Sequence, residues 1–154
     1  MLILELRLDY SEVCELAKLA CPELVPLEKP TEDLLQRLEE TVKTADDIYY
    51  PSRGDALLAG VFLFEQAAQE DNWKNDFSNL AYSRGITLFL EGTNLAIIGL
   101  STETLLVSSE LALFVMLHEM SHLAGVAHDD DFILRFSAQL ESYADYKQIS
   151  QVPE

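Results

Sequence analysis

The three histidines of this chain all lie within one short stretch, residues 118–128. The stretch reads HEMSHLAGVAHD, which is the pattern HExxHxxGxxHD. On a helix, His118 and His122 lie one turn apart on the same face, where two imidazoles can hold one ion. Glu119 follows the first histidine, at a position from which a carboxylate can reach a metal-bound water. The spacing therefore predicts a zinc site with a base beside it.

A third ligand is expected a few residues further along the chain. Gly125 can end the helix, because glycine allows the chain to turn back. His128 can then supply a third imidazole. Three protein ligands leave the fourth position of a tetrahedral zinc ion open, which is typical of catalytic rather than structural sites. We therefore expect Zn²⁺ to be held by His118, His122 and His128.

The residues around the motif predict that it lies on a buried helix. Residues 110–123 are largely apolar, Ser108 or Ser109 can cap the helix, and Glu110 suits its first turn. A helix that is apolar nearly all round belongs in a protein interior, where unpaired polar groups are costly. The alternative is that His118 and His122 are ordinary histidines without a metal. The absence of any histidine outside the motif favours the metal site.

The composition predicts one compact domain over residues 1–154. The chain is 49% hydrophobic, enough for a single core, and no repeat or long linker divides it. No uncharged apolar run approaches the roughly 18 residues that cross a bilayer, and residues 1–8 do not resemble a signal peptide. Cys14 and Cys21 are too few for a disulfide framework. We expect a cytoplasmic protein that has no membrane segment.

The charge balance bears on the kind of partner. The chain has 27 acidic and 10 basic residues, a net charge of −17. Such a surface repels phosphate backbones, so direct nucleic-acid binding is not expected. An acidic face that docks a basic partner is the sharper interpretation, and an ordinary solvated surface is the simpler one. No pattern in the sequence specifies the oligomeric state.

Hydrophobic periodicity predicts an α+β fold in which helices pack on a small sheet. A strand is plausible over residues 2–8, a helix is expected over 11–20, and Thr31 caps an amphipathic helix. Asp55 can cap a second hydrophobic helix that runs to about residue 69. This apolar stretch is read as a helix buried in the core.

The second half of the chain predicts a hairpin and a last helix around the motif. Residues 86–91 and 95–100 are expected strands, joined by a turn at Gly92 and placed directly before the motif helix. A final amphipathic helix begins at 129–131. Four residues are expected to share its apolar stripe: Phe132, Phe136, Leu140 and Tyr143.

From residue 95 onward the chain resembles a minimal zincin of the SprT/WLM group of metalloproteases. In that group a strand ending in Leu-Ser, here Leu100-Ser101, precedes the helix that carries HExxH, and an aromatic residue, here Phe132, follows the third histidine. The resemblance implies a zincin-like fold and a zinc-dependent peptidase that acts on a peptide or protein. Zinc-activated water would attack the peptide bond, with Glu119 as the general base. HExxHxxGxxHD is also the metzincin signature, but no methionine follows Met120 to form the metzincin methionine turn.

Two alternatives remain open. Residues 141–145, with the sequence ESYAD, resemble the ExxAD of gluzincins, in which a downstream helix supplies a glutamate to the metal. Glu141 would then replace His128, although the Gly125 turn and the suitability of imidazole for zinc favour His128. The functional alternative is a non-catalytic, zinc-binding acidic adaptor on a zincin scaffold. The presence of Glu119 favours the enzyme, because a purely structural ion needs no base beside it.

Overall fold

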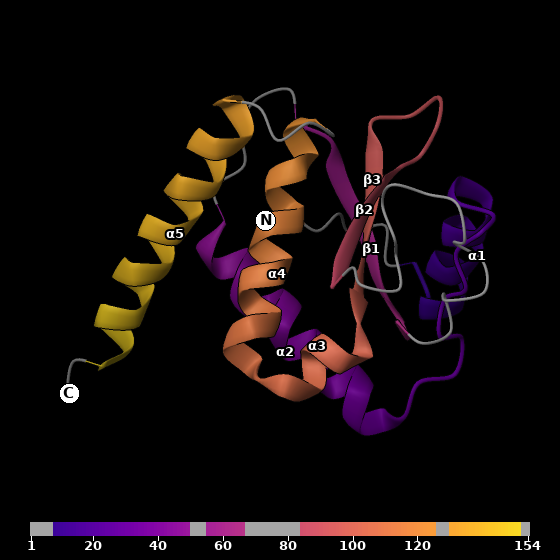
Figure 1. The fold of residues 1–154 in the computed structure, drawn as a ribbon, viewed down its shortest axis with the longest axis horizontal. Coiled ribbons are helices and arrows are strands. Elements are labelled where there is room, and N and C mark those ends of the chain that lie inside the picture. Colours follow the sequence, from indigo (N-terminus) through magenta and orange to yellow (C-terminus); the bar gives the residue numbers. More distant parts are fainter. Residues whose placement is uncertain (1–7, 50–54, 67–83, 126–129, 152–154) are drawn as a thin grey trace.

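The computed structural model describes residues 8–49, 55–66, 84–125 and 130–151 (Figure 1). The fold is α+β, with helices packed against a small sheet, as predicted. A 3-10 turn, His122–Ala124, follows the fourth of the helices. In chain order the other elements are α1 (Tyr10–Ala20), α2 (Glu32–Ile48), β1 (Leu57–Phe64), β2 (Gly85–Phe89), β3 (Leu95–Ser101), α3 (Thr102–Val107), α4 (Ser109–Ser121) and α5 (Asp130–Gln151).

The sheet has the strand order β1-β3-β2, so β3 is its central strand. β1 runs parallel to β3, and β2 runs antiparallel to it. The β2–β3 pair is the predicted hairpin. Gly92 in its turn has a φ of 77°, a left-handed conformation that glycine adopts without strain.

The two outer edges of the sheet differ. On β1, the Tyr10 hydroxyl donates to the Leu27 carbonyl at 2.6 Å and accepts the Leu63 N–H at 2.9 Å. The Leu27 N–H donates to the Leu63 carbonyl at 2.7 Å, so the chain before α2 covers this edge at Leu63. Among the described residues, β2 has a strand neighbour on one side only. Within that part of the chain, the outer side of β2 is therefore the open edge of the sheet.

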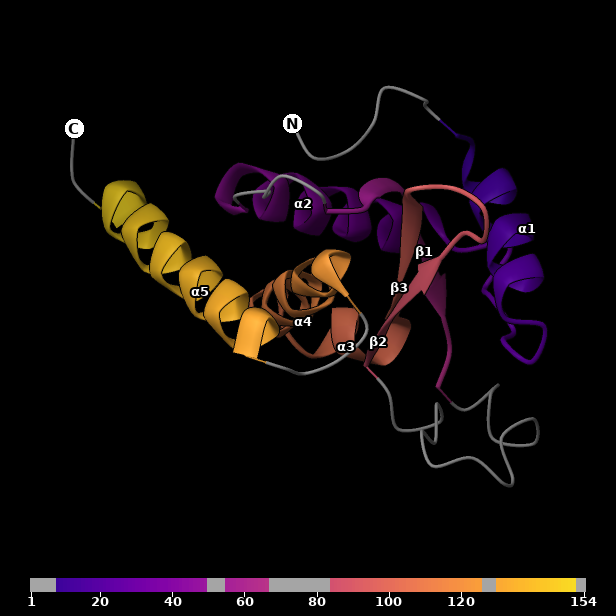
Figure 2. The same ribbon diagram turned by 90° about the horizontal axis from the view of Figure 1, so that it is seen from above.

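Helices cover both faces of the sheet (Figure 2). α1 packs on one face, whereas α2, α3 and α4 lie on the other, and α5 packs against α2 and α4 on the side away from the sheet. Successive side chains of β3 alternate between the two cores, as strand geometry requires. Ile97 belongs to the α1 side, whereas Ile98 and Leu100 belong to the α4 side. The motif helix α4 is thus enclosed by the sheet and by helices α2, α3 and α5.

The prediction of a helix from Asp55 is wrong, because Leu57–Phe64 forms strand β1. Side chains of this strand are buried against α1 on one face and against the α2–α4 side on the other. A strand buried on both faces loses its alternation and reads as a continuous apolar run, which periodicity alone does not separate from a buried helix. Asp55 is not a helix cap; its carboxylate pairs with Arg135.

The predicted helix caps are confirmed at two positions. Thr31 Oγ1 accepts the Leu34 N–H at 3.3 Å at the start of α2. Of the two candidate caps for α4, Ser108 is the one observed, and its Oγ accepts the Leu111 N–H at 3.0 Å. The strand expected over residues 2–8 lies, except for its last residue, outside the described part of the chain.

The buried stripe of α5 differs from the predicted one at one position. Phe132 is buried, and Phe136 and Tyr143 pack partly buried against the core, as expected. Leu140 is 39% exposed, and the neighbouring Gln139 is fully buried in its place. Among the described helices, none combines the length and the apolar character that crossing a bilayer requires.

Candidate metal centre

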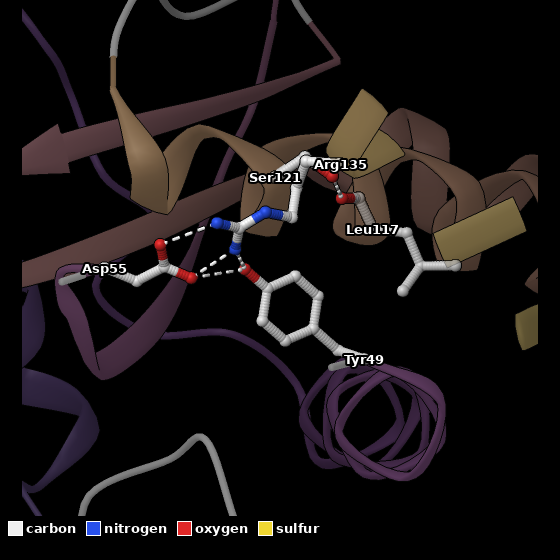
Figure 3. Close-up of polar contacts among 5 residues, drawn as sticks. All are labelled: Tyr49, Asp55, Leu117, Ser121 and Arg135. Carbon is white, nitrogen blue, oxygen red and sulfur yellow. Dashed lines mark hydrogen bonds and ion pairs between the residues drawn. The ribbon is translucent and has the colours of Figure 1, made fainter. Parts of the chain in front are cut away.

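Helix α4 carries His118 and Glu119 near its C-terminal end, and His122 begins the 3-10 turn that follows. The two imidazoles lie on the same side of the helix with their ring centroids 5.1 Å apart. Ser121, between them in sequence, is fully buried, and its hydroxyl donates to the Leu117 carbonyl at 2.8 Å (Figure 3). The structure therefore brings the predicted histidine pair together.

The backbone after the helix orients His122. Its Nδ1 lies 3.1 Å from the Gly125 carbonyl oxygen. Because a carbonyl only accepts, Nδ1 donates the proton, and the lone pair of the neutral ring is on Nε2. A carbonyl behind the ring is the usual way in which a metal-ligating histidine is oriented. Gly125 itself has extended backbone and follows the 3-10 turn, so the turn rather than a left-handed glycine ends the helix.

Two phenylalanines of α5 pack against the histidine rings. Phe132 stacks on His122 with ring centroids 4.4 Å apart and an interplanar angle of 27°. The same ring meets His118 edge-on at 4.9 Å, and Phe136 meets His118 edge-on at 5.2 Å. Phe132 is the aromatic residue that the resemblance to the SprT/WLM group places after the third histidine. α5 thus restricts the orientation of both imidazoles.

Glu119 points from α4 toward strand β2 and is only 8% exposed. The Thr87 hydroxyl lies 2.9 Å from Glu119 Oε1 and 3.0 Å from the Glu119 carbonyl oxygen. Burial raises the pKa of Glu119 to about 7, and the hydrogen bond from Thr87 opposes this rise. Its Oε2 is 3.9 Å from His118 Nε2, too far for a hydrogen bond. One carboxyl oxygen is therefore anchored, and the other lies beside the histidine.

Gly85, the first residue of β2, makes this approach possible. A methyl group at this position would lie 2.8 Å from Val115 Cγ1 and 2.9 Å from Glu119 Cγ, well inside van der Waals contact. Only a residue without a side chain lets α4 come this close to β2. The sequence marks Gly85 as a strand boundary, and nothing in it signals the contact with Glu119.

A cavity of about 420 Å³ opens beside His118 and Glu119. This volume falls within the range of ligand pockets in proteins. A larger hollow of about 600 Å³ lies between α2, α4 and α5, and neither histidine nor Glu119 lines it. The remaining residues around the smaller cavity are Arg84, Gly85, Phe114, Val115 and Phe136. Mostly apolar walls and one guanidinium therefore border the space next to the histidine and the carboxyl.

The spacing of the two described histidines matches that of two imidazoles on one zinc ion. Two imidazoles bound through nitrogen at ~2.0–2.1 Å in tetrahedral geometry have ring centroids about 5 Å apart, close to the observed 5.1 Å. His128 lies outside the described residues, so its role as third ligand stays a prediction. Glu141 is exposed on α5. Within the described ranges no group of three or more His, Cys, Asp or Glu side chains is placed to hold a metal, so Glu141 does not complete the histidine pair there.

In the metal-free protein, Glu119→Gln is expected to raise the free energy of unfolding at about pH 8 by up to about 3 kcal/mol. Burial lifts the carboxyl pKa from 4.5 to about 7, so the wild-type fold loses stability as the pH rises through this interval. Glutamine has no proton to lose. The difference between the two proteins should vanish near pH 4, where Glu119 is protonated in both the folded and the unfolded chain. Urea unfolding of chelator-treated protein at the two pH values measures it; a pH-independent difference would contradict the prediction.

Comparisons with protein-family models, with curated proteins and with solved structures found no match to this chain. The features of this chain that bear on its function are therefore the local geometry of His118, Glu119 and His122 and the cavity beside His118 and Glu119.

Proposed function

We propose that this chain is a zinc-dependent metallopeptidase with a zincin-like fold. His118, His122 and His128 would hold the ion, and Glu119 would be the general base. The observation that carries the proposal is the buried Glu119 carboxyl. It lies next to the imidazole of His118, which faces that of His122, and it borders a cavity. Zinc bound there would supply Lewis acidity toward a carbonyl oxygen and would acidify water.

The two carboxyl oxygens of Glu119 have different surroundings, which suits proton transfer. Thr87 donates to Oε1 and fixes the orientation of the group. Oε2 lies on the side of His118 and is the oxygen that accepts a proton from the attacking water. The same oxygen then returns the proton to the leaving amine. A carboxyl whose pKa burial brings close to neutrality is suited to both steps.

The hydrogen-bond pattern of the hairpin shows which backbone N–H and C=O groups of β2 face away from β3. The Ser101 N–H donates to the Arg84 carbonyl, and the Leu90 N–H donates to the Leu95 carbonyl, both at 2.9 Å. In an antiparallel ladder, every second residue bonds to the partner strand. The even-numbered residues from 84 to 90 therefore bond to β3. The odd-numbered residues between them present their N–H and C=O groups to the open edge.

These outward groups lie directly beside the candidate base. Gly85, Thr87 and Phe89 are the residues whose backbone faces the open edge, and their side-chain positions face α4. An extended peptide can add to such an edge through backbone hydrogen bonds. A peptide paired with Gly85 and Thr87 would pass next to Glu119. The open edge thus supports a polypeptide, rather than a small molecule, as the substrate.

The experiment that tests the proposal combines metal analysis with peptide cleavage. We expect one zinc per wild-type chain and its loss in His118→Ala and His122→Ala. A library of unstructured peptides, with cut sites read by mass spectrometry, should be cleaved by the zinc-loaded protein. Chelation should abolish cleavage, and added zinc should restore it. Absence of zinc would overturn the proposal, and zinc binding without cleavage across the library would support the non-catalytic adaptor instead.

Substitution at the two candidate third ligands is expected to distinguish them. His128→Ala should weaken zinc binding by more than about a hundredfold, the upper end of the loss when an outer-sphere partner is removed. Glu141→Ala should bind zinc like the wild type, because the Glu141 side chain is exposed and apart from the histidine pair. Competition with a chromophoric chelator measures both constants. The opposite ranking would assign the third position to Glu141.

A further inference from the structure

A buried ionic cluster joins Tyr49, Asp55 and Arg135 and takes no part in the proposed chemistry (Figure 3). Arg135 of α5 meets the Asp55 carboxylate with both ends of its guanidinium: Nη2 donates to Oδ1 at 2.8 Å, and Nη1 donates to Oδ2. Nη1 also donates to the Tyr49 hydroxyl at 3.0 Å, which donates to Asp55 Oδ2 at 3.3 Å. The Arg135 and Asp55 side chains are only 14% and 6% exposed.

The cluster supplies geometry more than net stability. A buried ion pair is often no more stabilising than apolar residues of the same size, because both charges lose their hydration. A two-pronged pair between a guanidinium and a carboxylate, however, fixes distance and angle at once. Tyr49 ends α2, Asp55 precedes β1, and Arg135 belongs to α5. One guanidinium therefore fixes the relative placement of three segments.

The segments fixed in this way are those that hold the histidine rings. Arg135 lies one helical turn after Phe132, the ring that stacks on His122. On the other side, the N–H of Ala56, next to Asp55, donates at 2.9 Å to the carbonyl of Leu123, next to His122. The ion pair thus connects the helix that carries the stacking ring to the backbone beside the stacked histidine.

We propose that Tyr49, Asp55 and Arg135 form a positioning cluster for the histidine pair. The cluster holds α5 where Phe132 stacks on His122, and so sets the orientation in which the imidazoles meet a metal. The effect on metal binding rests on the proposed function; the effect on ring stacking does not. None of the three residues touches the metal or the substrate in this assignment.

The test compares wild type with Arg135→Met by NMR of the histidine rings in metal-free protein and by zinc affinity. In the wild type, the Phe132 ring shields the ring protons of His122, which moves their resonances upfield. In Arg135→Met most of this shielding should be lost. The zinc dissociation constant should rise by about tenfold to a hundredfold, as for other outer-sphere partners of metal ligands.

Three further variants separate positioning from general loss of stability. Arg135→Lys keeps a positive charge beside Asp55 but lacks the two-pronged guanidinium. It should therefore fold and show His122 ring-proton shifts between those of the wild type and those of Arg135→Met. Ser142→Ala removes a second contact between α5 and α2, the 2.6 Å hydrogen bond to the Ile48 carbonyl, farther from the histidines. Val13→Ala truncates a core side chain on the opposite face of the sheet. Both controls should keep the wild-type ring shifts and zinc affinity.

Unchanged His122 ring shifts in both Arg135 variants would overturn the proposal, as would equal losses of shielding in Val13→Ala. A wild-type protein that binds no zinc would contradict the proposed function, and the ring shifts would still decide whether the cluster positions the histidines.

Discussion

Glu119→Gln is expected to leave zinc bound and to lower kcat/KM for peptide cleavage about a thousandfold, within the usual contribution of a general base. Glutamine has the size of glutamate and can still accept the Thr87 hydroxyl that fixes Oε1. It cannot take a proton from water. The variant should therefore keep the geometry of the site and lose only the transfer step. Zinc stoichiometry and initial cleavage rates at equal zinc content measure the effect.

A matched control for this substitution lies on the same helix. Glu110→Gln makes the identical chemical change at an exposed carboxylate in the first turn of α4, which pairs with Lys147 at 3.8 Å. It should cleave peptides at the wild-type rate. Full activity in Glu119→Gln would remove Glu119 from the mechanism. Loss of zinc together with activity would instead show that this carboxyl supports the metal.

Gly85→Ala is expected to lower kcat/KM about a hundredfold, the effect of misplacing a catalytic group by about 1 Å. The added methyl would lie 2.8 Å from Val115 Cγ1 and 2.9 Å from Glu119 Cγ, so either α4 moves away from β2 or the glutamate side chain turns. Either change separates Glu119 from Thr87. The crowding should also cost about 1–3 kcal/mol of unfolding free energy.

Gly92→Ala is the control that separates these two effects. Gly92 lies in the turn at the far end of the same hairpin, and a methyl group there would meet no atom within 4 Å. Its φ of 77° makes alanine strained by about 1 kcal/mol. We expect a lower melting temperature and unchanged cleavage. A Gly85→Ala protein that loses stability without losing activity would show that Glu119 tolerates displacement.

Local signals in the sequence were sufficient to predict helix α4, which carries the motif, and the hairpin that precedes it. The Ser108 cap and the apolar run that follows it predict α4, and Gly92 between two β-rich segments predicts the hairpin. These signals lie within a few residues of the structure they specify. The same locality explains why His118 and His122 come together as expected, since one helical turn is enough to pair them.

Contacts between distant segments could not be predicted. Thr87 is far from Glu119 in sequence, and neither its hydroxyl nor the missing side chain of Gly85 indicates the helix that would pack there. The sequence of β1 predicts a helix because a strand buried on both faces lacks the alternation of apolar and polar residues. Asp55 reads as a cap because its partner, Arg135, lies on the last helix. What the sequence lacks in each case is the tertiary neighbour that gives the residue its role.

The two outer edges of the sheet differ in how they could pair with a second copy of this protein. Tyr10 and Leu27 occupy the β1 edge at Leu63, whereas β2 has no strand on its outer side among the described residues. A second copy could add its own β2 to this edge, which would give a dimer. Such a dimer would bury the backbone groups beside Glu119, so under the proposed function a high protein concentration would compete with peptide binding.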